Sequence, residues 1–234
     1  MQKVTILAGL QNTPGDPFFL QALGDTLESE KAWSELQEHF QQQLSALPSG
    51  SPIEAYAHYM LGKAAAELED FQRALPHLER SVELHPQFPY SLHLLGRSYR
   101  QIGRFNEALD AHQRCSSLAP SFPWSWYEIG EVYLLLDQPS RAIPHLKTAL
   151  GYQREQDPEH LDLFFKAIKK AESAHRLQQR RAIASELWPD RPPLESGQAL
   201  EPIEELELSL FSLKLTLDQV EGRRNSRSIN ELSS

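Results

Sequence analysis

One block of 34 residues occurs three times without a gap, and this repeat restricts the fold of the chain more than any other feature. The three copies are residues 55–88, 89–122 and 123–156. The eighth position of the copies is always glycine: Gly62, Gly96 and Gly130. Glycine costs roughly 1 kcal/mol relative to alanine inside a helix, so its recurrence predicts that a second helix packs closely against this position.

Each block is predicted to form two helices joined by a turn. The turns are expected where polar residues or glycine interrupt the apolar periodicity, at residues 69–70, 103–104 and 137–139. Past each turn, an alanine recurs in one column: Ala74, Ala108 and Ala142. Since a single hairpin cannot bury its own apolar face, neighbouring hairpins must stack on one another.

The pattern resembles the tetratricopeptide repeat, whose unit reads W-x2-L-G-x2-Y, then A-x3-F, then P. The Leu-Gly pair is present as Leu61-Gly62 and Leu95-Gly96, with Ile129-Gly130 in the third copy. The tryptophan column departs from the family and reads His58, Leu92 and Trp126. The resemblance implies an all-α, right-handed α-solenoid of helix-turn-helix hairpins with a concave and a convex side.

The segments before the three copies show weaker patterns. Residues 1–16 have no strong period and are expected to form a short N-terminal arm. Residues 17–50 are interpreted as a degenerate copy, because Leu23 and Gly24 stand in the Leu-Gly columns and Trp33 stands where Phe71 begins the next second helix. Terminal repeats are expected to be atypical.

After residue 156 the pattern stops halfway. Phe164 takes the glycine position, so no partner helix could approach there, and residues 157–188 are predicted to form one long capping helix. Residues 189–202 contain several prolines and a glycine and are interpreted as a linker.

Residues 203–222 are predicted to form an amphipathic, heptad-like helix. Its apolar stripe, spaced alternately by three and four residues, is an expected face for oligomerisation or for docking of the tail: Ile203, Leu206, Leu210, Leu213, Leu217 and Val220. A β-strand is the alternative, since leucines also alternate here. Residues 223–234 are polar and are expected to be disordered.

Composition restricts the classes of partner. A net charge of −9 argues against nucleic acid and anionic membrane surfaces, which favour clustered lysine and arginine. No apolar run approaches the roughly 20 residues of a membrane-spanning helix. The single cysteine, Cys115, excludes an intramolecular disulfide and favours a cytoplasmic protein.

No catalytic motif, cofactor motif or metal-ligand spacing is present, so we expect no catalytic residue, no cofactor and no metal site. His77 and His145 occupy the same column of two copies, which indicates the geometry of the unit rather than a site. Cys115 lies in a column of small residues with Ser81 and Ala149, which is typical of a packed, inert thiol. The chain is therefore expected not to be an enzyme.

The resemblance implies that the second, fifth, ninth and twelfth positions of each first helix point into a concave groove. The residues expected to bind a partner there are Phe18, Tyr56, Tyr59, Lys63, Tyr90, His93, Arg97, Arg100, Trp124, Tyr127 and Glu131. Aromatic rings around the basic centre of Lys63, Arg97 and Arg100 suit a peptide or helix with apolar anchors and a carboxylate near its middle. The alternative is that the rings pack against neighbouring helices and the charges are merely solvated. Some members of the family bind a C-terminal carboxylate with a two-carboxylate clamp of lysine and asparagine side chains. The corresponding groove positions of this chain contain no asparagine, so this type of binding is not expected.

The hypothesis favoured by these columns is a non-enzymatic adaptor or scaffold that binds a protein partner in the groove. A second hypothesis is a structural subunit that self-associates through residues 203–220. A third is the regulatory component of a glycosyltransferase, methyltransferase or sulfotransferase system. The partner and the pathway do not follow from the sequence.

Overall fold

The computed structural model describes residues 3–156, 160–187 and 209. Within these residues every regular element is a helix and no strand is present, which confirms the predicted all-α solenoid. Two compact units divide the chain, residues 1–171 and 172–234, and the division falls inside the last described helix. The predicted linker, the stripe of residues 203–220 except residue 209, and the polar tail all lie outside the described residues.

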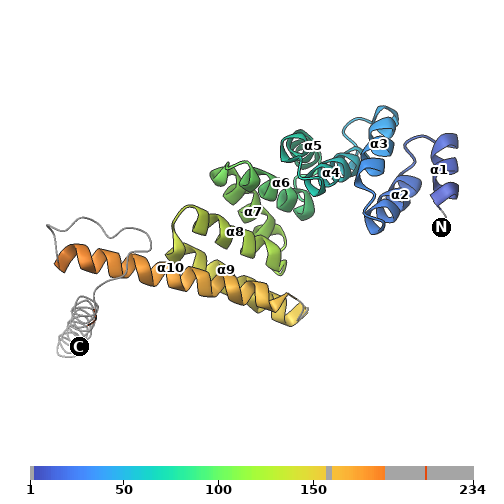
Figure 1. The fold of residues 1–234 in the computed structure, drawn as a ribbon. Coiled ribbons are helices and arrows are strands. Elements are labelled where there is room, and N and C mark those ends of the chain that lie inside the picture. The colour runs from blue at the N-terminus through green and yellow to red at the C-terminus, as the bar shows by residue number, and fades with distance from the viewer. Residues whose placement is uncertain (1–2, 157–159, 188–208, 210–234) are drawn as a thin grey trace, which may run out of the picture. The chain divides into compact units, whose positions relative to one another are not determined.

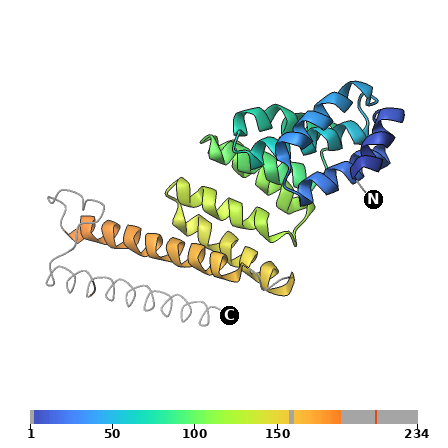
Figure 2. The same cartoon turned by 45° about the vertical axis from the view of Figure 1, so that its right-hand side comes forward.

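Four helical hairpins follow one another along the first unit (Figures 1 and 2). They are α2 (Pro17–Ser29) with α3 (Trp33–Gln43), α4 (Pro52–Glu67) with α5 (Phe71–Leu84), α6 (Pro89–Gln101) with α7 (Phe105–Leu118), and α8 (Pro123–Leu135) with α9 (Pro139–Gln156). A short 3-10 turn, η1 (Leu44–Ala46), follows α3. A proline begins every first helix, where its missing N–H removes no hydrogen bond of the helix.

The turn inside every hairpin has a left-handed residue at the same column. These residues and their φ angles are Lys31 at 54°, Glu69 at 61°, Gly103 at 80° and Asp137 at 53°. The three turns predicted in the strong copies are confirmed. Only Gly103 adopts this conformation without a steric cost, so three of the four turns contain local strain.

The recurrent glycines lie where the two helices of a hairpin approach each other most closely. A Cβ atom on Gly62 would be 2.6 Å from Leu78 Cγ, and one on Gly130 would be 2.5 Å from Leu146 Cγ. In the middle hairpin His112 replaces the leucine, and its Nε2 would lie 2.5 Å from a Cβ on Gly96. The helices could not pack at this distance with any larger residue, which confirms the prediction made from the repeat.

The N-terminal arm contains a helix, α1 (Lys3–Asn12), which the sequence period did not predict. Its Gly9 packs against Phe19, since a Cβ there would be 2.5 Å from Phe19 Cζ. Lys3 lies 2.7 Å from Glu35 of α3. Packing on the first hairpin therefore stabilises a helix whose own sequence has no clear apolar face.

At the other end of the first unit, α10 (Leu161–Leu187) begins against the last hairpin. Phe164, the residue at the glycine position, is fully buried and lies 5.3 Å from the Trp124 ring and 5.1 Å from the Tyr127 ring. Ala167, Ile168 and Ala171 belong to an apolar cluster with buried residues of the last hairpin. Instead of admitting a partner helix, Phe164 fills the space next to α8.

Candidate partner-binding site

The predicted groove residues come from the four first helices, α2, α4, α6 and α8, and successive first helices contact one another. We call this set the first-helix row. It consists of Phe18, Tyr56, Tyr59, Lys63, Tyr90, His93, Arg97, Arg100, Trp124, Tyr127 and Glu131. Because each position recurs once per hairpin, the row combines side chains that are far apart in the chain.

The aromatic residues of the row divide into exposed and packed rings. Phe18 is 63% exposed and Tyr90 is 53% exposed, and both are available to a partner. Tyr56 is partly buried and lies 6.1 Å from the Phe40 ring, and Trp124 packs on the buried Phe164. The alternative that the rings pack within the array therefore applies to Tyr56 and Trp124. The rings of Phe18 and Tyr90 remain largely exposed.

A continuous line of ring contacts crosses the centre of the row. Phe88 lies 5.0 Å from Tyr59 and 5.6 Å from Tyr90, and Phe122 lies 5.9 Å from Tyr90 and 5.1 Å from His93. Sequence reasoning missed Phe88 and Phe122, although both occupy the last position of their blocks. That shared column was the signal that could have identified them.

All three cations of the row are paired with carboxylates of adjacent first helices. Lys63 of α4 donates to Glu28 of α2. Arg97 of α6 lies 3.6 Å from Glu67 of α4. Arg100 of α6 lies 2.8 Å from Glu128 of α8. The basic centre expected from the sequence is thus neutralised within the array, because the partner carboxylates come from columns that were not considered.

Arg100 and Glu128 form the most buried of these pairs. Their side chains are 21% and 8% exposed. Arg100 Nε and Glu128 Oε2 form an ion pair. Burial raises the pKa of Glu128, and the charges of Arg100 and Arg97 oppose that effect. The pair therefore connects α6 and α8, and Arg100 has a structural role.

His93 and His112 lie next to this pair, with their ring centroids 5.6 Å apart. Burial, together with the nearby charges of Arg97 and Arg100, lowers the pKa of His93 to about 3. His112 is fully buried, and neither of its ring nitrogens has a hydrogen-bond partner among the described residues. Both rings are therefore neutral at physiological pH, and His93 adds no charge to the row.

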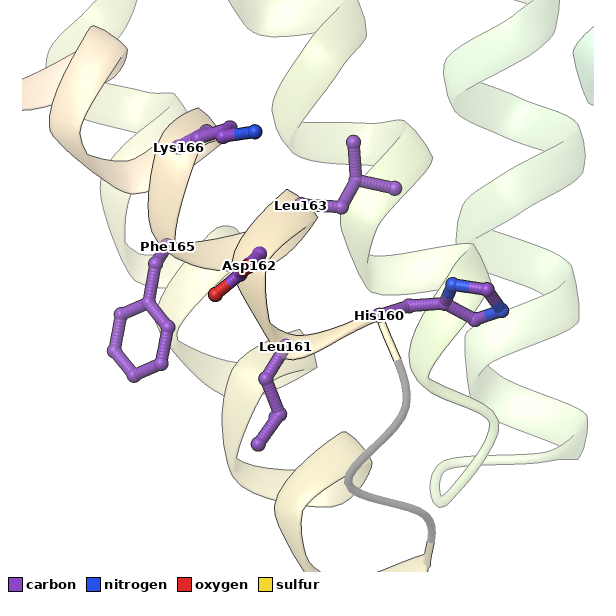
Figure 3. Close-up of a pocket in the computed structure, with 6 residues that line it drawn as sticks. All are labelled: His160, Leu161, Asp162, Leu163, Phe165 and Lys166. Carbon is purple, nitrogen blue, oxygen red and sulfur yellow. The ribbon is translucent and has the colours of Figure 1, made fainter.

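A separate pocket lies at the beginning of α10, outside the row. Its lining residues are His160, Leu161, Asp162, Leu163, Phe165 and Lys166 (Figure 3). Its ionisable residues are His160, Asp162 and Lys166. Within the described part of the chain, no three His, Cys, Asp or Glu side chains gather as metal ligands would.

Cys115 is fully buried and donates to the Pro89 carbonyl oxygen over 3.2 Å. Burial raises the pKa of its thiol to about 11, so the reactive thiolate is scarce. Ser81, at the same column of the preceding copy, donates to the equivalent carbonyl of Ala55. The shared contact explains why this column holds small side chains.

The fold and the repeat columns agree with a comparison against known families. A family model described as the tetratricopeptide repeat matches residues 20–91 and 59–121. Residues 20–121 of the chain are therefore tetratricopeptide repeats. The comparison with curated protein sequences gave no match.

Solved structures share the tetratricopeptide-repeat fold with this chain. YrrB, described as a TPR protein with an unusual peptide-binding site, is 24% identical with a TM-score of 0.56, over 68% of this chain and 78% of its own. MamA is 24% identical with a TM-score of 0.57, over 64% of this chain and 86% of its own. The TPR2B domain of yeast Sti1, in complex with pHsp70, is 14% identical with a TM-score of 0.50, over 51% of this chain and 96% of its own. At these identities the likeness shows the fold alone.

None of the helices in the described part of this tetratricopeptide-repeat protein is long and apolar enough to cross a membrane.

Proposed function

We propose that this tetratricopeptide-repeat protein is a non-enzymatic adaptor that binds a peptide or a helix of a protein partner along the first-helix row. The observation that carries the proposal is the exposure of two large apolar rings in the row, Phe18 and Tyr90. Exposed aromatic rings beside polar groups are typical of interface anchors. YrrB has an unusual peptide-binding site and the TPR2B domain of Sti1 forms a complex with pHsp70, and both support the same use of the fold.

Tyr90 is the better candidate for the main anchor. Its ring contacts the rings of Phe88 and Phe122, whose centroids lie 5.6 and 5.9 Å away, while about half of the Tyr90 surface remains exposed. A ring held on two sides loses little conformational freedom when a partner covers it. Phe18 contacts only Phe19 among the described aromatic rings, and it lies in the first hairpin, so it would extend the contact rather than centre it.

The test is selection of binders from a random peptide library displayed on phage, with the full chain as bait. Enriched peptides should lose affinity about tenfold or more for Tyr90→Ser, as expected for an aromatic anchor at an interface centre. Leu118→Ser is the matched control, because Leu118 is 43% exposed but belongs to a second helix. If Leu118→Ser weakens binding and Tyr90→Ser does not, the partner uses another surface and the proposal is wrong.

A further inference from the structure

One lysine of the array, Lys63, occupies a cation-binding position within the first-helix row. Lys63 donates to the Glu28 carboxylate, and its Nζ atom lies 5.8 Å from the centroid of the Tyr59 ring. The ammonium group is thus held between a carboxylate and the face of an aromatic ring, two interactions that both favour a cation. Lys63 is only 17% exposed, so this site is already filled from within.

A similar pair of side chains occurs at the C-terminal end of the row without an internal cation. Tyr127 and Glu131 are four residues apart on α8 and therefore share one face of the helix. They stand in the same columns as Tyr59 and Lys63. Burial and the neighbouring Glu131 charge raise the pKa of Tyr127 to about 12. Within the described residues, Glu131 has no ion pair.

The N-terminal end of the row has a second unmatched carboxylate. Asp25 occupies the ninth column in α2 and is exposed. A Cβ atom on Gly24, the residue before Asp25, would lie 2.4 Å from the Tyr56 hydroxyl oxygen, so the Tyr56 ring reaches α2 beside Asp25. Asp25 forms no ion pair with any residue that the structure describes.

The charges that remain after internal pairing are therefore acidic. Lys63, Arg97 and Arg100 are matched by carboxylates of adjacent helices, whereas Asp25 and Glu131 are unmatched. A partner carboxylate near an arginine would meet a cation that already has an internal carboxylate beside it. A partner cation would meet an available carboxylate at either end, and the net charge of −9 would attract it from a distance.

We infer that the partner segment is cationic and that lysine or arginine side chains engage Glu131 with Tyr127 and Asp25 with Tyr56, on either side of an apolar anchor at Tyr90. The inference rests on the proposed function and names the chemistry of its partner. It replaces the carboxylate-bearing peptide expected from the sequence, because the internal ion pairs could not be seen there.

The test uses the peptide selection described above on the full chain. Selected peptides should be enriched in lysine and arginine over the starting library. The double variant Asp25→Asn/Glu131→Gln should weaken their binding about five- to tenfold, as expected for the loss of two partly exposed ion pairs and their cation–π support. The affinity of the wild-type chain should also fall as salt is raised.

Glu38→Asn with Asp110→Asn is the matched control, since it removes the same number of charges from the second helices α3 and α7. It should leave binding within about twofold, because distant exposed charges act weakly in salt. Peptides enriched in Asp and Glu that lose affinity for Arg97→Gln would overturn the inference and retain the proposed function. Neutral peptides that depend on Tyr90 would also overturn it. Failure to select any peptide sensitive to Tyr90→Ser would contradict both.

Discussion

His58 Nδ1 lies 3.0 Å from His77 Nδ1, across the hairpin that α4 and α5 form. One neutral ring donates this hydrogen bond and the other accepts it, whereas two protonated rings would repel each other. Burial lowers the pKa of both histidines. At His58 the Glu54 carboxylate opposes this shift and Arg80 adds to it, and at His77 the neighbouring His58 and Arg73 add to it.

The histidine pair should make the hairpin sensitive to acid. Because the folded-state pKa values lie below the ordinary value, the unfolded chain binds more protons, so this stability is complete above about pH 6.5 and is lost as the pH falls below it. Leucine is the natural residue at this position in the next copy, where it is Leu92. The variant His58→Leu should therefore lose less stability between about pH 7 and about pH 5 than the wild-type protein does. Urea denaturation at both pH values measures it. His85→Gln, at an exposed histidine, is the control, and an unchanged loss in His58→Leu would contradict the prediction.

Alanine should have opposite effects on stability at a closely packed glycine and at an open one. Gly62→Ala should destabilise the protein by about 1–3 kcal/mol, because its Cβ would be 2.6 Å from Leu78 Cγ and the core would be overpacked. Gly151→Ala, in helix α9, should instead stabilise it by about 0.5–1 kcal/mol, since a Cβ there meets nothing within 4 Å and alanine is the better helix former. Chemical denaturation gives both values. Equal effects at the two positions would exclude close packing as the reason for the glycine column.

The left-handed turn residues should respond to glycine in the same way. Glu69→Gly should raise the free energy of unfolding by roughly 0.5–1 kcal/mol, because relief of strain at a φ of 61° exceeds the added entropy of the unfolded chain. The reverse change, Gly103→Ala at a φ of 80°, should lower it by about 1 kcal/mol. Thermal and urea unfolding of both variants measure the difference. A destabilised Glu69→Gly protein would show that contacts of the side chain outweigh the strain.

Variants of Arg100 test whether this residue stabilises the fold or contacts a partner. Arg100→Met should destabilise the protein by about 3–5 kcal/mol because it leaves the buried Glu128 carboxylate without its cation. The double variant Arg100→Met/Glu128→Leu should recover most of this loss, since it removes both charges. The damage from Arg100→Met should be smaller at about pH 5 than at about pH 7, because burial already raises the pKa of Glu128 and a protonated carboxyl needs no cation.

A double-mutant cycle over these variants gives the coupling between the two residues. If Arg100→Met leaves stability unchanged while peptide binding is lost, Arg100 is a partner contact rather than a structural cation.

Sequence reasoning placed the helical hairpins because their determinants are local and recurrent. Gly62 and Ala74 lie in the same hairpin, and their columns require the same close approach in every copy. The turn at residues 69–70 likewise follows from an interrupted apolar pattern, whereas the left-handed conformation of Glu69 was not predicted. The helix α1 was missed because its order comes from packing against Phe19 rather than from a period of its own.

The sequence by itself determined the repeat, the hairpins and the columns in which aromatic and charged side chains would line up. Only the tertiary structure decided which of these side chains remain available, because that depends on contacts between helices of different hairpins. Glu28 lies 35 residues before Lys63, and Glu128 lies 28 residues after Arg100. No local period specifies such pairs, since they arise only when hairpins stack. Stacking neutralised the arginines, whereas it left half of the Tyr90 surface open and left Glu131 without an ion pair among the described residues.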